Sequence, residues 1–173
     1  TFPKYKTEEI TGAFFGVCYV PVMLSFLYQT REMQDGAYAV WPIFLSSWGC
    51  DTCAYCSGML LGKHRLAPVL SPKKSIEGAV GGTVGAALLG FLFASVFGGQ
   101  MRGISDPKLV CTAACAIAAV ISQIGDLAAS AIKRNHDIKD YGHLIPGHGG
   151  ILDRFDSMIF TAPAIFFALT FLG

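Results

Sequence analysis

The sequence predicts an all-α, polytopic integral membrane protein in which about five transmembrane helices carry a polar active site that faces the cytoplasm. Three observations favour this class. Hydrophobic residues make up 53% of the 173 positions, and the mean hydropathy is +0.50. Charged residues make up 14%, well below the roughly 25% of soluble domains. The apolar residues also gather into runs of about 17–25 positions, the length that crosses the hydrocarbon core.

We expect five spans, over residues 11–28, 37–61, 76–97, 109–132 and 152–172, within a single domain of residues 1–173. Asp51 interrupts the second span. A soluble bundle with a very large core is the alternative, and repeated runs of this length argue against it. A net charge of +1 gives no reason to expect nucleic acid as a partner.

Lysines and arginines are distributed unevenly between the two sides that five crossings define. Short cytoplasmic loops are enriched in these residues, so the richer side marks the cytoplasm. Ten fall on one side: Lys4, Lys6, Lys63, Arg65, Lys73, Lys74, Lys133, Arg134, Lys139 and Arg154. Three fall on the other: Arg31, Arg102 and Lys108. We therefore expect a cytoplasm-facing active site in a bacterial inner membrane, or an equivalent cytosol-facing membrane, with the C-terminus outside.

Cys50, Cys53 and Cys56 form a C-x2-C-x2-C pattern that superficially resembles an iron–sulfur or zinc ligand set. A tetrahedral zinc site needs a fourth ligand. Residues at i, i+3 and i+6 drift by about 60° around a helix at each step and share one broad face. We interpret the three cysteines as packing residues, and a cytoplasm-facing membrane protein gives no reason to expect disulfides.

Asp51 and Asp126 lie within predicted spans, where a carboxylate costs about 2.5–3.5 kcal/mol on insertion scales and usually faces a polar cavity. Pairing with a basic residue is the structural alternative to metal or phosphate chemistry. Ser130, Lys133 and Arg134 follow Asp126 at i+4, i+7 and i+8, on one helical face. This ridge would carry an acid, a hydroxyl and two cations to the cytoplasmic boundary.

Asp153 and Asp156, three positions apart, open the last predicted span, where a helix N-terminus favours negative charge. If this pair meets Asp126, the carboxylate oxygens would form a site for a hard cation such as Mg²⁺. A second cation is left open. A zinc site from His143, His148 and Asp153 is conceivable but would be crowded by basic groups.

Two loops between spans have the composition of phosphate-binding segments. Residues 142–150 read GHLIPGHGG, in which glycines let backbone N–H groups approach an anion closely. His148 would contact a phosphate there or cap the loop. Residues 71–78 read SPKKSIEG, where serines and paired lysines precede a helix N-terminus and predict a triphosphate cradle. The alternative for Lys73 and Lys74 is contact with lipid headgroups.

Residues 130–156 resemble the signature of the phosphatidate cytidylyltransferase (CDP-diacylglycerol synthase) family. That signature has the form S-x-x-K-R-x4-K-D-x-G-x2-[LIF]-P-x-H-G-G-x2-D-R-x-D. The chain supplies every fixed position: Ser130, Lys133, Arg134, Lys139, Asp140, Gly142, Ile145, Pro146, His148, Gly149, Gly150, Asp153, Arg154 and Asp156. So many fixed positions at the required spacing argue against chance.

Two further blocks are similar to family segments in the same order. Residues 51–64 look like D-T-x-A-Y-x2-G-x3-G-K-H, and residues 71–78 look like S-P-x-K-[TS]-x-E-G. The resemblance covers about residue 51 to the C-terminus. Because family members usually have additional N-terminal helices, we expect this chain to be the C-terminal, catalytic part of a longer enzyme.

The resemblance implies transfer of CMP from CTP to phosphatidate, giving CDP-diacylglycerol and pyrophosphate, with Mg²⁺ as cofactor. The expected catalytic residues are Lys133, Arg134, Lys139, Asp140, His148 and Arg154. The expected substrate-binding residues are Asp51, Ser71, Lys73, Lys74, Ser130, Gly149 and Gly150. The expected metal ligands are Asp126, Asp153 and Asp156. CTP, phosphatidate and the lipid bilayer are the expected partners, and a homodimer is left open.

Two other functions fit parts of the pattern. A CTP-dependent polyprenol or phytol kinase would transfer the γ-phosphate to a lipid alcohol and would need a base such as Asp140. A cation transporter would use intramembrane aspartates as its pathway. A transporter should carry polar residues across the whole bilayer, whereas here they gather at one face.

Overall fold

The first helical rod confirms the first predicted span and extends it at both ends. In the computed structural model, which describes residues 4–68, 70–142 and 149–173, the rod consists of α1 (Thr7–Val17), a π-helical turn η1 (Cys18–Val22) and α2 (Met23–Glu32). Pro21 lies inside the π-helical turn. Proline has no N–H to donate, so a local change of helical hydrogen bonding at this position has a direct cause.

The second predicted span, residues 37–61, is a broken helix. It consists of α3 (Gly36–Ala39), α4 (Trp41–Phe44), a π-helical turn η2 (Leu45–Gly49) and α5 (Cys50–Leu61). Four helical segments in the described part of the chain are long and apolar enough to cross a membrane, and this segment is not one of them. Serines and Asp51 lower its hydropathy, so the fifth span stays a prediction.

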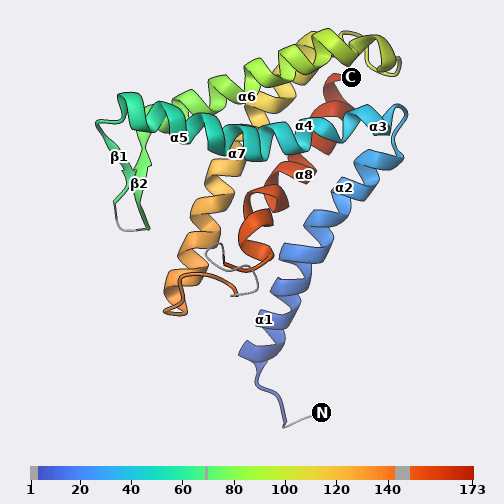
Figure 1. Ribbon diagram of the computed structural model, residues 1–173. Coiled ribbons are helices and arrows are strands. Elements are labelled where there is room, and N and C mark those ends of the chain that lie inside the picture. The colour runs from blue at the N-terminus through green and yellow to red at the C-terminus, as the bar shows by residue number, and fades with distance from the viewer. Residues whose placement is uncertain (1–3, 69, 143–148) are drawn as a thin grey trace.

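A two-stranded antiparallel hairpin follows α5, so the all-α prediction is wrong in this segment. Strand β1 (Arg65–Ala67) pairs with β2 (Ser71–Ser75), with Arg65 opposite Ser75 and Ala67 opposite Ser71. Pro72 disfavours helix in the residue before it. The chain must also reverse direction here, because α5 and α6 pack side by side (Figure 1).

The remaining three helices are long and begin close to where the sequence predicts. Helix α6 (Ile76–Phe97) begins and ends at the predicted residues, and the Ser75 hydroxyl caps it by accepting a hydrogen bond from Gly78 N at 3.1 Å. It is followed by a short 3₁₀ turn, η3 (Gly98–Gln100). Helix α7 (Pro107–Asn135) extends beyond the predicted 109–132 at both ends, and α8 (Leu152–Leu172) begins and ends as predicted.

Small residues let α5, α6 and α7 approach closely. A Cβ at Gly82 would lie 2.8 Å from the Ala54 side chain, and one at Gly90 would lie 2.6 Å from the Cys111 carbonyl oxygen. A separate apolar core joins α4, α7 and α8, with Ile43, Met158 and Ile165 fully buried in it.

Of the three clustered cysteines, Cys50 packs in a buried core with Ala86 and Ala119, as predicted, whereas Cys56 does not. Cys50 is fully buried, Cys53 is half-buried and Cys56 is exposed, and all are free thiols. No group of three His, Cys, Asp or Glu side chains within the described ranges converges as a metal site. The C-x2-C-x2-C pattern therefore does not assemble a metal centre among these residues.

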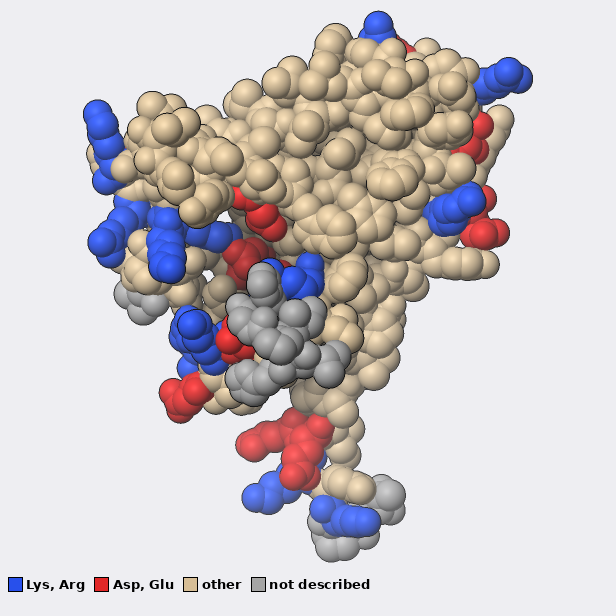
Figure 2. Space-filling model, in the orientation of Figure 1, with Lys and Arg blue, Asp and Glu red and all other residues tan. Residues whose placement is uncertain are grey.

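The chain is a mostly helical integral membrane protein whose charged groups are unevenly placed. The start of α1 and the end of α8 lie at opposite ends of the molecule (Figure 1). In the view of Figure 2, lysines, arginines and acidic residues gather around a hollow beside the hairpin, and the upper part of the same face is largely uncharged.

Candidate functional site

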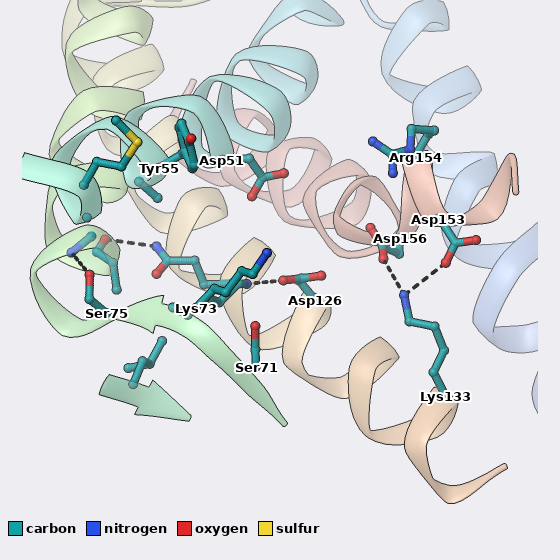
Figure 3. A pocket seen from close by; sticks show the side chains of 18 of the residues that line it. Asp51, Tyr55, Ser71, Lys73, Ser75, Asp126, Lys133, Asp153, Arg154 and Asp156 are labelled. Carbon is teal, nitrogen blue, oxygen red and sulfur yellow. Dashed lines mark hydrogen bonds and ion pairs between the residues drawn. The ribbon is translucent and has the colours of Figure 1, made fainter. Parts of the chain in front are cut away.

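A pocket of about 660 Å³ opens where the hairpin, α5, α6, α7 and the first turn of α8 meet. Its polar lining comes from segments far apart in the sequence (Figure 3). Four cationic side chains line it: Lys73, Lys74, Lys133 and Arg154. Five carboxylates line it as well: Asp51, Asp126, Asp140, Asp153 and Asp156. The folded chain thus brings the predicted phosphate-binding segment 71–78 to one cavity with acidic and basic residues of α7 and α8. Of the other predicted segment, residues 143–148 lie outside the described residues, and Gly142, Gly149 and Gly150 do not line the cavity.

The hairpin side of the pocket is joined to α7 by an ion pair. The Lys74 ammonium on β2 pairs with a carboxylate oxygen of Asp126, and both side chains are about a quarter exposed. Asp126 therefore has a basic partner. Such pairing is the alternative that the sequence left open beside a role in metal or phosphate binding.

The α8 side of the pocket is built around Lys133. Its ammonium lies 3.1 Å from a carboxylate oxygen of Asp153 and 3.5 Å from one of Asp156 (Figure 3). It also lies 5.1 Å from the centre of the Tyr141 ring, in the range of a cation–π contact. Burial raises the pKa of Tyr141, so its phenol stays neutral and donates a hydrogen bond to the Ala129 carbonyl.

Asp153 is held by backbone donors as well as by Lys133. Its second carboxylate oxygen accepts hydrogen bonds from Tyr141 N and Gly150 N, both at 2.9 Å. Gly149 has a φ of 79°, which L-residues other than glycine rarely adopt. The glycine pair therefore turns the chain so that one N–H reaches Asp153 and α8 can begin.

Comparison with known proteins gives one consistent answer. The sequence profile of the cytidylyltransferase family matches residues 2–172. The chain belongs to the cytidylyltransferase family. It is 40% identical over 165 residues to a phosphatidate cytidylyltransferase of Staphylococcus saprophyticus and 39% identical over 167 residues to one of Staphylococcus aureus. It is 35% identical over 170 residues to one of Bacillus subtilis.

These relatives are longer than the chain. The alignments cover 94–98% of this chain and 60% of each of the three relatives. The family assignment therefore applies to nearly every residue described here, and the whole relatives also contain sequence outside this match.

Most of the sixteen predicted site residues line the pocket. Ten of the predicted site residues do so: Asp51, Ser71, Lys73, Lys74, Asp126, Lys133, Asp140, Asp153, Arg154 and Asp156. They come from α5, β2, α7, the segment after α7, and α8. Asp51, residues 71–78 and residues 130–156, which the resemblance assigns to one site, thus contribute side chains to the same cavity.

Five predicted site residues do not line this pocket: Arg134, Lys139, Ser130, Gly149 and Gly150. Arg134 is exposed and donates to the Ile138 carbonyl at 3.3 Å. The prediction that it shares a face with Asp126 is wrong, because eight residues at 100° leave it about 80° around the helix. Gly150 directs its N–H to Asp153 and not into the cavity. His148 and His143 lie outside the described residues.

Four polar contacts in or beside the pocket were not predicted from the sequence, and the pocket-lining Gln123 makes two of them. The Gln123 amide nitrogen donates to Ala79 O and Thr83 Oγ1 on α6, at 3.2 and 3.0 Å. The hydroxyls of Ser47 and Ser157 are hydrogen-bonded at 2.7 Å. The Trp48 indole N–H donates to the Arg154 carbonyl at 3.2 Å.

A signal for these contacts was present in the sequence. Gln123 is an amide within an apolar run, three positions before Asp126. Ser47 and Trp48 interrupt the run before Asp51. Polar side chains at such positions usually bond across helices, but their partners follow only from the fold.

The carboxylates have the donor chemistry that Mg²⁺ prefers, since they offer oxygen ligands around one cavity. In this structure the ammonium groups of Lys74 and Lys133 contact three of them, Asp126, Asp153 and Asp156. Although the three carboxylates line one pocket, no group of three His, Cys, Asp or Glu side chains in the described part of the chain is close enough together to hold a metal ion. Asp126, Asp153 and Asp156 as a metal-ligand set therefore stay a prediction. The residue types of the site, by contrast, fit a hard cation.

Proposed function

We propose that this protein transfers CMP from CTP to phosphatidate, giving CDP-diacylglycerol and pyrophosphate. The observation that carries this proposal is the joint lining of one pocket by four cations and five carboxylates, all of them from the three family-like sequence blocks except Asp126. The similarity to proteins named phosphatidate cytidylyltransferase supports it, over nearly the whole chain.

The proposed reaction joins two polyanions and needs no general base. A phosphate monoester has a second pKa near 6 and is largely ionised at neutral pH. An oxygen of the phosphatidate phosphate forms a bond to the α-phosphorus of CTP, and the bond from this phosphorus to the bridging oxygen breaks. Pyrophosphate leaves with that oxygen. The demands on the protein are charge neutralisation and in-line positioning.

The cationic side chains of the pocket meet the first demand. Lys73 and Lys74 on β2 bind the triphosphate, and Arg154 at the start of α8 binds the lipid phosphate from the opposite side. Lys133 holds Asp153 and Asp156 in place and adds positive charge at the centre. Asp51 contacts the nucleotide or orients a ligand. Lys139 and Arg134, which do not line the pocket, are further phosphate-binding cations that the family signature implies.

Asp126 and Asp156, with Asp153 behind them, are the residues that would hold Mg²⁺. The ion would neutralise phosphate charge and stabilise the leaving pyrophosphate. Binding of this cation requires the carboxylates to release part of their contact with Lys74 and Lys133, which would free both ammonium groups for phosphate oxygens. A second cation has the same donor set available.

The uneven charge distribution supports a pocket that faces the cytoplasm. Four of the lining side chains are lysine or arginine, and cytoplasmic loops carry the excess of these residues. The nucleotide substrate is also available on that side. Residues 36–61 would then form the fifth crossing, or a broken helix that lines the cavity at membrane depth.

Incorporation of α-³²P-labelled CTP into a chloroform-soluble product tests the proposal. The purified protein, in detergent with phosphatidate and Mg²⁺, should convert the label into CDP-diacylglycerol and release unlabelled pyrophosphate. A lipid-alcohol kinase would leave the label in CDP and would accept polyprenol or phytol. No labelled lipid under these conditions would contradict the proposed function.

A further inference from the structure

The base of the hairpin is closed by a single carboxylate, that of Glu77 in the first turn of α6. One of its oxygens accepts hydrogen bonds from the backbone N–H groups of Lys63 and His64, at 3.1 and 3.2 Å. The other lies 2.6 Å from Nδ1 of the His64 ring. The backbone adds one more link, because Ile76 N donates to the His64 carbonyl at 2.9 Å.

The pairing of the two strands with each other is limited. Its strands have three and five residues, and the register of β1 against β2 shifts between Arg65 and Ala67. A two-stranded hairpin of this size is marginally stable by itself in water. The contact between Glu77 and residues 63–64 therefore holds the start of β1 against the first turn of α6.

The strand held in this way carries the pocket's cationic edge. Ser71, Lys73, Lys74 and Ser75 on β2 all line the cavity, and Lys74 reaches Asp126. Glu77 does not line it. Among the described residues its ion-pair partner is His64, whose side chain is 74% exposed. The carboxylate therefore has no direct contact with the cavity and acts through the backbone.

We propose that Glu77 is a positioning residue that fixes the start of the hairpin and thereby aims Lys73 and Lys74 at the nucleotide triphosphate. The inference rests on the proposed function for the identity of that ligand. We call the contacts of Glu77 with Lys63 and His64 the Glu77 clamp. Because the phosphatidate side of the pocket is built from α7 and α8, loss of this clamp weakens nucleotide binding and leaves lipid binding intact.

The test compares Glu77→Ala with Glu9→Ala. Glu9 is a matched control, because it also lies in the first turn of a helix and accepts a backbone N–H, from Lys6 at 2.8 Å, away from the pocket. We expect Glu77→Ala to raise the KM for CTP roughly tenfold, since small misplacements of binding groups have effects of this size or more. The KM for phosphatidate should change by less than about twofold. Glu9→Ala should leave both constants unchanged.

A conservative variant keeps the test valid if Glu77→Ala does not fold. Glu77→Gln preserves the side-chain shape and one acceptor oxygen, so it should retain part of the clamp and show a smaller rise in the KM for CTP. A rise of the KM for CTP and the KM for phosphatidate by the same factor would indicate a general structural role and would overturn the inference. A fall in kcat with an unchanged KM for CTP would overturn it as well.

Hydrogen–deuterium exchange separates this inference from the proposed function, because it needs no turnover. In the absence of substrates, the amides of Lys63 and His64 should exchange faster in Glu77→Ala than in the wild type and in Glu9→Ala. Unchanged exchange over residues 63–75 would refute the clamp, whatever the wild-type activity. Faster exchange in a wild type that makes no CDP-diacylglycerol would support the clamp and refute only the proposed function.

Discussion

Lys74 of β2 forms an ion pair with Asp126 of α7 across the pocket, although 52 positions separate the two residues. This pair joins the hairpin to the helix that carries the first half of the family signature. It also gives the intramembrane aspartate its countercharge, which lowers the free-energy cost of its burial. A cation that binds here would replace Lys74 as the partner of Asp126. A phosphate would replace Asp126 as the partner of Lys74.

Replacement of Lys74 by methionine should reduce CDP-diacylglycerol formation at least about 100-fold, a loss typical for removal of a charge that stabilises a transition state. The change removes the triphosphate contact and leaves Asp126 without its partner. Lys108→Met, at the start of α7 and away from the pocket, is the matched control and should keep wild-type turnover. Labelled-CTP incorporation measures both. Near-wild-type activity of Lys74→Met would contradict the assigned role of β2.

Lys133→Met should lower the free energy of unfolding by about 3–5 kcal/mol, the usual penalty for removing one partner of a buried ion pair. The Lys133 side chain is 11% exposed, and it is the shared partner of Asp153 and Asp156, which are 4% and 11% exposed. Its loss leaves two carboxylates close together without a countercharge.

Thermal unfolding in detergent measures this effect. The neighbouring Arg134→Gln is the control, since Arg134 is exposed and bonds only to a nearby carbonyl among the described residues. It should unfold close to the wild-type temperature. Equal midpoints for the two variants would show that Lys133 is not the centre of this cluster.

The helices could be predicted from the sequence because hydrophobic length is a direct physical requirement for crossing a bilayer. Helices α6 and α8 begin at the expected residues since Ser75 caps the first and Asp153 falls in the first turn of the second. The convergence of Asp51 with Asp126 was also predictable, because intramembrane carboxylates usually share a polar cavity.

The hairpin and the partners of individual charges could not be predicted in the same way. Strands β1 and β2 have only three and five residues, and β2 is polar, so no periodic pattern distinguishes them from a loop. Lys133 was expected to bind phosphate, and its contacts with Asp153 and Asp156 depend on how α7 packs on α8. Gly150 was assigned to the ligand, whereas its N–H is used by Asp153.

The glycine pair before α8 should not tolerate side chains. In Gly149→Ala a Cβ must adopt a φ of 79°, which costs roughly 1–2 kcal/mol. In Gly150→Ala the Cβ would lie 2.9 Å from the backbone nitrogen of Gly142, so the backbone itself must shift. We expect both variants to unfold at lower temperature, with Gly150→Ala the more damaging and also impaired in turnover. Gly99→Ala, where no atom lies within 4 Å of the new Cβ, is the control.

Removal of divalent cations should abolish turnover, and added Mg²⁺ should restore it, because the proposed reaction brings two polyanions together in one cavity. Asp126→Asn should raise the Mg²⁺ concentration needed for half-maximal turnover, since it removes one negative oxygen ligand while keeping the side-chain shape. Asp140→Asn, which changes a lining carboxylate outside the proposed ligand set, should shift this concentration less. Titration of EDTA-treated enzyme with Mg²⁺ measures the three curves. If Asp126→Asn requires no more Mg²⁺ than the wild type, Asp126 serves only as the partner of Lys74 and is not a metal ligand.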